Sequence, residues 1–282
     1  MIQKLPATVV AEPAVKPPDA PPNGSDYFDV RRNKFRALVR LVIYVVITMY
    51  HIIIALIQSL VLNASNPRAG NFKSLRLMSW ANNLNKALGI SVAVKGWVPH
   101  EAALLVANHR SYIDITAIGG LVPATFLAKQ EVSHWPVLGY GCTLVDVVFV
   151  DRKSPESRKQ SRNDVAERLN NGMSVIIFPE GTSFEGPGLL QFRPGIFQVA
   201  SESGFPVVPV AIEYDDPSDA WVGEDTFLRH FMQTFSKKSI PVTVTFGPKL
   251  RGANYEILRN ASWDWINTTL MSDPKILQYI HY

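Results

Sequence analysis

The sequence holds a single cysteine, Cys142, among its 282 residues, so an internal disulfide framework is excluded. It also lacks the Cys and His spacings of zinc sites and the glycine-rich loops of nucleotide-binding folds. We therefore expect no metal site and no bound cofactor. The formal charge of +4 and the isoelectric point near 9.1 suit an anionic membrane surface, an anionic small substrate or nucleic acid. Because the arginines cluster beside an apolar segment, we expect no nucleic-acid partner.

Large apolar residues are scarce in the first 26 positions, where six prolines stand among alanines. A segment of this composition cannot bury a core and favours an extended, solvated chain. We interpret residues 1–30 as a disordered tail rich in proline and alanine.

Formal charge is absent from residues 41–62, an apolar run that is long enough for a membrane helix and too long for a signal-peptide core. Basic residues flank the run on both sides: Arg31, Arg32, Lys34, Arg36 and Arg40 before it, and Arg68, Lys73 and Arg76 after it. These flanks leave two arrangements open, a single crossing or a helix pair dipping into one leaflet. We predict a basic flank and membrane-associated helical region over residues 31–88, with the following domain on the cytoplasmic face.

From residue 89 to the end, short β-branched runs alternate with helical stretches. The predicted strands are residues 91–96, 103–109, 124–129, 144–151, 174–180, 206–214 and 240–247. A helix should start after Ser154 and end at Gly172, and another should cover residues 255–270. The alternation predicts an α/β fold, a sandwich with a largely buried mixed sheet flanked by helices. The membrane-associated helix or helix pair would precede this domain of residues 89–282.

The first polar cluster follows the apolar run 103–107, where His109 and Asp114 stand five positions apart. On one helix that spacing would separate the two side chains by about 140°. We therefore predict His109 at a strand end and Asp114 in the first turn of the next helix. There the carboxylate can hold the imidazole Nδ1 and leave Nε2 free as a base. The alternative is structural, with Ser111 capping the helix and Asp114 completing the cap.

Further polar residues follow other predicted strands. FPEGTS, residues 178–183, places backbone N–H groups and the Glu180 carboxylate after a buried strand, where open α/β sheets bind ligands. Arg152 comes directly after VFVD, and Arg193 lies in FRPG shortly behind FPEGTS. Taken singly, these segments can be plain turns and solvated charges, although arginine donors also suit phosphate or carboxylate.

Taken in order, these segments resemble the glycerolipid acyltransferase family with the NHxxxxD motif, which includes 1-acylglycerol-3-phosphate acyltransferases. NHRSYID resembles the family's first block, VVFVDR its second, FPEGTS its third, and VVPVAI around Pro209 its fourth. The resemblance covers roughly residues 75–250. Four blocks in the same order make it specific, whereas NHxxxxD alone would be weak.

The resemblance implies an enzyme that moves a fatty acyl group from acyl-CoA or an acyl carrier protein to the free hydroxyl of a lysolipid. The leading acceptor is 1-acylglycerol-3-phosphate, which would give phosphatidic acid. His109 would be the general base and Asp114 its orienting partner, by the logic of serine hydrolases. Arg152 would bind the acceptor's phosphate, and Glu180, Gly181 and Thr182 would belong to the acceptor site. Membrane lipids would be the other partners.

One departure from the family pattern concerns position 183, where many phosphatidic-acid-forming members carry arginine and this chain carries Ser183. Arg193 could supply the missing charge from the same loop. Otherwise the acceptor is another lysolipid, such as a lyso-aminolipid of the lyso-ornithine type or a lysophospholipid with a larger head group. A phospholipid transacylase and a lipid-binding scaffold without turnover are the remaining alternatives.

Overall fold

The computed structural model describes residues 33–61, 69–135 and 137–272. The chain divides into two units, residues 1–31 and 32–282. The first unit, with the tail expected at residues 1–30, lies outside the described residues. All described residues belong to the second unit, and the predicted domain boundaries stay predictions.

A seven-stranded sheet forms the centre of this unit, in the order β1-β7-β6-β2-β5-β3-β4. The strands are β1 (Ile90–Lys95), β2 (Leu104–Ala107), β3 (Ala124–Lys129), β4 (Val148–Val150), β5 (Ser174–Ile177), β6 (Val207–Tyr214) and β7 (Ile240–Phe246). Neighbours pair in parallel except β6 and β7, which are antiparallel. Each strand overlaps one of the seven predicted segments, so the predicted mixed α/β sheet is confirmed.

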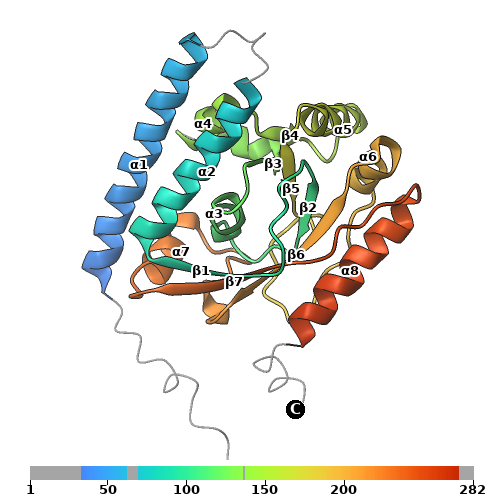
Figure 1. Cartoon of the computed structure of the whole chain (residues 1–282). Helices are drawn as coiled ribbons and strands as arrows, with labels where there is room; N and C mark the ends of the chain where they lie inside the picture. Colours follow the sequence, from blue (N-terminus) through green and yellow to red (C-terminus); the bar gives the residue numbers. More distant parts are fainter. Residues whose placement is uncertain (1–32, 62–68, 136, 273–282) are drawn as a thin grey trace, which may run out of the picture. The chain divides into compact units, whose positions relative to one another are not determined.

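Helices cover both faces of the sheet (Figure 1). One face carries α2 (Ala69–Leu88), α3 (Ile113–Gly119) and α7 (Phe227–Thr234), and the other carries α5 (Pro155–Asn170), α6 (Gly195–Ser203) and α8 (Tyr255–Met271). In β2, Leu105 and Ala107 join the first core, whereas Leu104 and Val106 join the second. Successive side chains of a strand point to opposite faces, so a strand buried on both sides must be apolar throughout.

The two predicted helices form as expected, but β2, β4 and β5 are each shorter than predicted, β4 most of all. Ser154 caps α5 by accepting from the N–H of Ser157 at 3.1 Å, and Asn254 caps α8. The strand predicted over residues 144–151 is β4, which begins only at Val148, because α4 (Leu138–Leu144) takes the first residue of the run. Asp146 then turns the chain with a φ of +60°.

Helix α1 (Lys34–Val61) is the membrane-helix candidate and lies beside α2 (Figure 1). Among the described residues it is the one helix long and apolar enough to cross a membrane, and only 22% of its most apolar window is buried. Its buried face packs against α2, α4 and α7. Its outer face exposes Leu38, Val42, Val46, Met49, Tyr50, Ile53, Ile57 and Leu60. This exposed stripe is consistent with membrane association.

Candidate active site

Several carboxyl ends of parallel strands meet at one edge of the sheet, because β2 pairs with both β5 and β6 and β5 pairs with β3. His109 follows β2, Glu180 follows β5, and Tyr214 ends β6. Lys129 ends β3, and Arg152 follows β4 on its far side. The sheet order therefore assembles residues that are far apart in the sequence at the edge where open α/β sheets bind ligands.

The predicted pair of His109 and Asp114 forms. His109 Nδ1 lies 2.8 Å from Asp114 Oδ2, and the Asp114 side chain is fully buried. Oδ2 also accepts from the backbone N–H groups of Arg110 and Ser111, and Oδ1 accepts from the Tyr214 hydroxyl at 2.6 Å. With four donors, Asp114 is held as an acceptor, so the proton of the shared hydrogen bond lies on His109 Nδ1, and in the neutral ring Nε2 is the acceptor nitrogen.

The alternative interpretation of this segment was a helix cap formed by Ser111 and Asp114, and it holds for Asp114 but not for Ser111. Asp114 does bind backbone N–H groups in the turn before α3, as a capping residue would. Ser111, however, is not the cap: α3 begins at Ile113, and the buried Ser111 hydroxyl has no partner among the described residues. The turn and the histidine contact therefore depend on the same carboxylate.

The His109 ring is held flat against the Phe178 ring, with centroids 4.2 Å apart and planes 21° apart. Its side chain is 23% exposed and lines a cavity. Within the described part of the chain, hydrogen bonds occupy its Nδ1 and its backbone N–H but not Nε2. Stacking and the Nδ1 bond fix the ring's orientation, so Nε2 is the nitrogen available for proton transfer.

Glu180 supports this arrangement from the backbone side. It is 4% exposed, and its two oxygens accept from the N–H groups of His109 and Leu190 at 2.8 and 2.9 Å. Burial raises the pKa of the Glu180 carboxyl, and the two backbone hydrogen bonds oppose that rise. Because both oxygens are occupied, the contacts seen here position the His109 loop. Direct acceptor binding by Glu180 stays a prediction.

Arg152 and Arg193 meet at Gly181. Arg152 Nη1 donates to the Gly181 carbonyl, and a Cβ on Gly181 would lie 2.8 Å from Arg193 Nε. Gly181 also has a φ of +81°, so glycine alone fits this close approach without strain. Thr182 follows as an exposed residue of the cavity wall.

Lys129 is a third cation in this group, and sequence reasoning missed it. Burial first, then the charges of Arg152 and Arg193, lower its pKa. None of the three cations forms an ion pair with a carboxylate among the described residues. The available signal was its place as the charged last residue of a predicted strand. The cluster can bind an anion.

A cavity of about 420 Å³ runs from this polar group toward the helix pair. His109, Arg152 and Gly181 line one part of it. Apolar and aromatic side chains from α1, α2, β3 and α4 form most of the remainder, among them Tyr44, Ile52, Leu77, Trp80, Phe126, Leu138 and Val145. Its size and apolar walls are those of a small-ligand pocket with a few polar groups at the reacting end.

Trp221 is another cavity residue that the sequence did not single out. Its backbone N–H donates to the Arg110 carbonyl at 2.8 Å, and its carbonyl accepts from the Ser183 hydroxyl. The Ser183 hydroxyl is therefore bound to the protein's own backbone. Ser183 thereby joins the 178–183 loop to the segment that contains Trp221.

Comparison with known families agrees with this geometry. A family model described as Acyltransferase matches residues 90–213, which contain β1 to β5, all but the last residue of β6, and both members of the His109 and Asp114 pair. Over these residues the chain is similar to that acyltransferase family. The predicted resemblance is therefore confirmed, whereas the roles of single residues stay predictions.

Two relatives show how the acyltransferase family match divides between acceptors. A lyso-ornithine lipid O-acyltransferase from Pseudomonas aeruginosa is 40% identical over 54% of this chain and 60% of its own length. A 1-acyl-sn-glycerol-3-phosphate acyltransferase from Neisseria gonorrhoeae is 36% identical over 57% of this chain and 66% of its own length. The match thus spans less than two thirds of either relative.

A solved structure shows the same fold. The 1-acyl-sn-glycerophosphate acyltransferase PlsC from Thermotoga maritima superposes with a TM-score of 0.59 at 21% sequence identity. The match covers 82% of this chain and 96% of that one. At this identity the likeness establishes the acyltransferase fold and nothing about the acceptor.

Proposed function

We propose that the protein transfers a fatty acyl group from a thioester to the free hydroxyl of a lysolipid. The observation that carries the proposal is the oriented His109, which lines a largely apolar cavity together with Lys129 and Arg152, two of the three clustered cations. An apolar cavity suits the acyl chain, a free imidazole nitrogen suits deprotonation of an alcohol, and the cations suit an anionic head group. Neither a metal nor a cofactor is needed for this chemistry.

In the proposed reaction His109 Nε2 takes the proton of the acceptor hydroxyl as its oxygen attacks the thioester carbonyl. The new C–O bond forms, the C–S bond breaks, and the proton on Nε2 passes to the departing thiolate. Asp114 stabilises the transient imidazolium without itself becoming protonated, as in serine hydrolases. A positioned histidine base contributes about 10²- to 10⁴-fold to such a step.

The oxyanion of the tetrahedral intermediate needs hydrogen-bond donors aimed at it. Thr182 and Ser183 lie in the cavity wall, and their backbone N–H groups make no hydrogen bond to any other described residue. We assign the oxyanion to these two groups. In this proposal Thr182 acts in the site through its backbone N–H and not through its side-chain hydroxyl.

For the acceptor, the three cations Lys129, Arg152 and Arg193 favour 1-acylglycerol-3-phosphate, whose phosphomonoester carries up to two negative charges. They stand in for the arginine that Ser183 replaces. A second candidate, lyso-ornithine lipid, is favoured by the 40% identical relative. Its single carboxylate would need fewer cations than a phosphomonoester. The number of cluster cations on which acceptor binding depends therefore distinguishes the two acceptors.

At the membrane, we propose that the exposed stripe of α1 enters one leaflet rather than crossing the bilayer. The opposite face of α1 packs against α2, α4 and α7, so a crossing would carry the attached sheet domain into the hydrocarbon. The lysolipid then enters from the leaflet, and acyl-CoA or an acyl carrier protein approaches from the cytoplasm. Because both donors are soluble in the cytoplasm, we propose that the domain lies on that face of the membrane.

The test is an assay of the purified full chain in detergent micelles with a panel of acceptors. Lysophosphatidic acid, other lysophospholipids and lyso-ornithine lipid are each offered with acyl-CoA and with acyl carrier protein thioesters. His109→Ala should abolish acyl transfer and retain lysolipid binding, while His100→Ala, an exposed histidine, should match the wild type. Turnover retained in His109→Ala would refute the base role. Binding without turnover in the wild type on every pair would favour the scaffold alternative.

A further inference from the structure

The first turns of α1 occupy four consecutive backbone carbonyls between α7 and β7. Arg40 donates to the carbonyls of Phe235, Lys237 and Lys238 at 3.1, 2.7 and 3.0 Å. The carbonyl between them, that of Ser236, accepts from Arg36 Nη1 and from the N–H of Asn33, both at 3.1 Å. Two arginines of the predicted basic flank, Arg36 and Arg40, are therefore bound to the protein itself.

Arg40 is built into this position. It is 9% exposed, and its guanidinium meets three carbonyls rather than a carboxylate. Space for it exists only because residue 89 is glycine: a Cβ there would lie 2.2 Å from Arg40 Nη2. The guanidinium satisfies carbonyls left open where α7 ends, a role that solvent cannot fill in a buried place.

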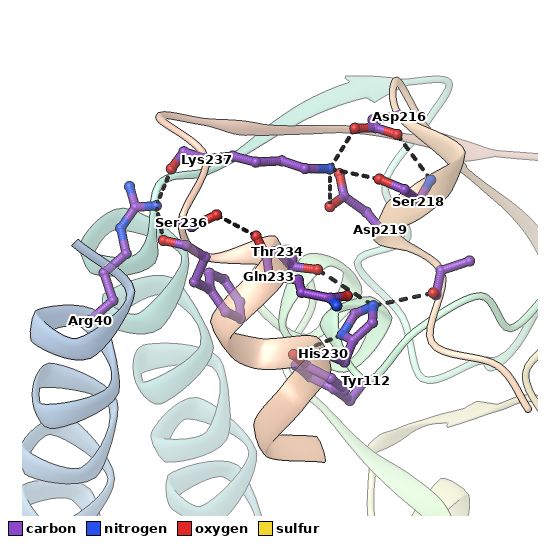
Figure 2. A network of polar contacts seen from close by, with 12 residues as sticks. Arg40, Tyr112, Asp216, Ser218, Asp219, His230, Gln233, Thr234, Ser236 and Lys237 are labelled. Atoms are coloured by element: carbon purple, nitrogen blue, oxygen red, sulfur yellow. Dashed lines mark hydrogen bonds and ion pairs between the residues drawn. The ribbon is translucent and has the colours of Figure 1, made fainter. Parts of the chain in front are cut away.

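The Lys237 side chain continues from the same segment in the opposite direction (Figure 2). It is 4% exposed, and its ammonium lies 2.5 Å from Asp216, 2.6 Å from Asp219 and 3.1 Å from the Ser218 hydroxyl. Asp219 is fully buried. One lysine thus holds both ends of the short 3₁₀ helix Pro217–Asp219, and breaking a buried charge contact of this kind is costly.

That short helix leads directly into the cavity wall. The carbonyl of Ala220 accepts from His230 Nε2 at 3.1 Å, and His230 Nδ1 lies 3.2 Å from the Tyr112 hydroxyl (Figure 2). Trp221 comes next, bonded to Arg110 and Ser183 and packed edge-on against Tyr112 at 5.3 Å. The wall beside the catalytic pair is therefore held from behind by Lys237, whose own backbone is held by α1.

We propose that Arg40 and Lys237 are positioning residues that make the placement of Trp221 depend on the docking of α1. The inference rests on the proposed function, because Trp221 would bound the acceptor side of the cavity. When α1 is seated, the carbonyls of 235–238 are fixed, Lys237 holds the 216–219 turn, and Trp221 closes the wall beside Ser183. When Arg40 cannot bind, the turn loosens and acceptor binding weakens while the His109 and Asp114 pair stays intact.

Kinetics of the full chain in vesicles test the first link. Arg40→Ala should raise KM for the lysolipid about tenfold, the effect of losing roughly one charged hydrogen bond, with kcat little changed. Arg40→Lys keeps the charge but cannot reach three carbonyls, so it should fall between. Lys34→Ala is the matched control, since it removes the same charge from the exposed first residue of α1.

Fluorescence provides a readout that does not need turnover. Subtracting the emission of a Trp221→Phe background isolates Trp221, and its maximum should shift to the red in Arg40→Ala but not in Lys34→Ala. Lys237→Met should give the same shift. Should that variant not fold, Lys237→Met with Asp219→Asn avoids an unpaired buried carboxylate and tests the same link.

The outcomes separate cleanly. Unchanged Trp221 emission in folded Arg40 and Lys237 variants overturns the proposal, whatever the kinetics. A raised KM without a Trp221 shift overturns it too and assigns the effect to membrane attachment. If the wild type turns over no acceptor, the proposed function has failed, while the emission still decides whether α1 positions Trp221.

Discussion

At the scale of single residues, Asp114 holds most of the candidate site together. One buried carboxylate accepts from an imidazole, two backbone N–H groups and a tyrosine. Hydrogen bonds to charged groups are roughly twice as strong as neutral ones, so each donor restricts the carboxylate's position. The orientation of His109 is therefore set by residues that never touch a substrate.

Tyr214 provides the most separable of these contacts. Burial first, and then the Asp114 carboxylate, raise the pKa of its phenol well above the usual value, so the hydroxyl stays protonated and donates to Asp114. Tyr214→Phe should lower kcat about tenfold, the effect of losing one charged hydrogen bond, with little change in KM for the thioester. Steady-state kinetics measure this. Tyr255→Phe, on α8, is the matched control, and equal kcat in both variants would remove Tyr214 from the catalytic arrangement.

Lys129 carries a prediction about the head group. If its ammonium shares the acceptor phosphate with Arg152 and Arg193, Lys129→Met should raise KM for lysophosphatidic acid by about tenfold and leave kcat nearly unchanged. The exposed Lys153, three positions after the end of β4, supplies the control Lys153→Met. A KM that matches the control would place the phosphate elsewhere.

At the scale of elements, α1 divides its surface between protein and lipid. Val46 is 60% exposed on the outer stripe, and Ile257 is 66% exposed on α8, on the opposite face of the sheet. Val46→Glu should weaken vesicle binding about tenfold or more, since a charge at membrane depth costs a few kcal/mol. Ile257→Glu should not. Vesicle sedimentation compares the two, and equal binding would show that another surface carries attachment.

The boundary between α4 and β4 shows the limit of reading elements from apolar runs. The run around residues 144–151 looks like one strand, yet its first residue completes a helix and Asp146 turns the chain. The Asp146 carbonyl accepts from the Thr125 hydroxyl, in the neighbouring strand β3. The break depends on a tertiary contact, which periodicity along the chain does not record.

At the scale of the whole molecule, α1 is part of the folded body and of the cavity. Deleting residues 1–63 removes the cavity walls formed by Tyr44, Thr48, His51 and Ile52 and the donors to the 235–238 carbonyls. We expect that protein to aggregate and to lack acyl transfer even in detergent. Deleting residues 1–31 spares every described contact and should retain turnover. Gel filtration and the acyl-transfer assay measure both, and soluble, active protein from the longer deletion would contradict this account.

The local signals in the sequence proved sufficient for much of the fold and part of the site. Strands buried on both faces must be apolar throughout, so seven short apolar runs predicted the seven strands. The spacing of His109 and Asp114 was enough to place one at a strand end and the other in the next helix, because that geometry depends on only six consecutive residues.

Only the tertiary structure decided which distant segments of the chain contact one another. Tyr214 reaches Asp114 across 100 positions because β6 lies beside β2, and Arg40 reaches Lys237 across 197. Lys129 and Trp221 likewise become candidate site residues only through their neighbours in the folded structure. The sequence by itself determined the α/β class, the resemblance to the acyltransferase family and the pairing of His109 with Asp114, because these depend on local pattern. The order of the strands and the packing of α1 decided which other residues support that pair. Burial and electrostatic interactions depend on how close residues lie in space, not on their separation along the chain.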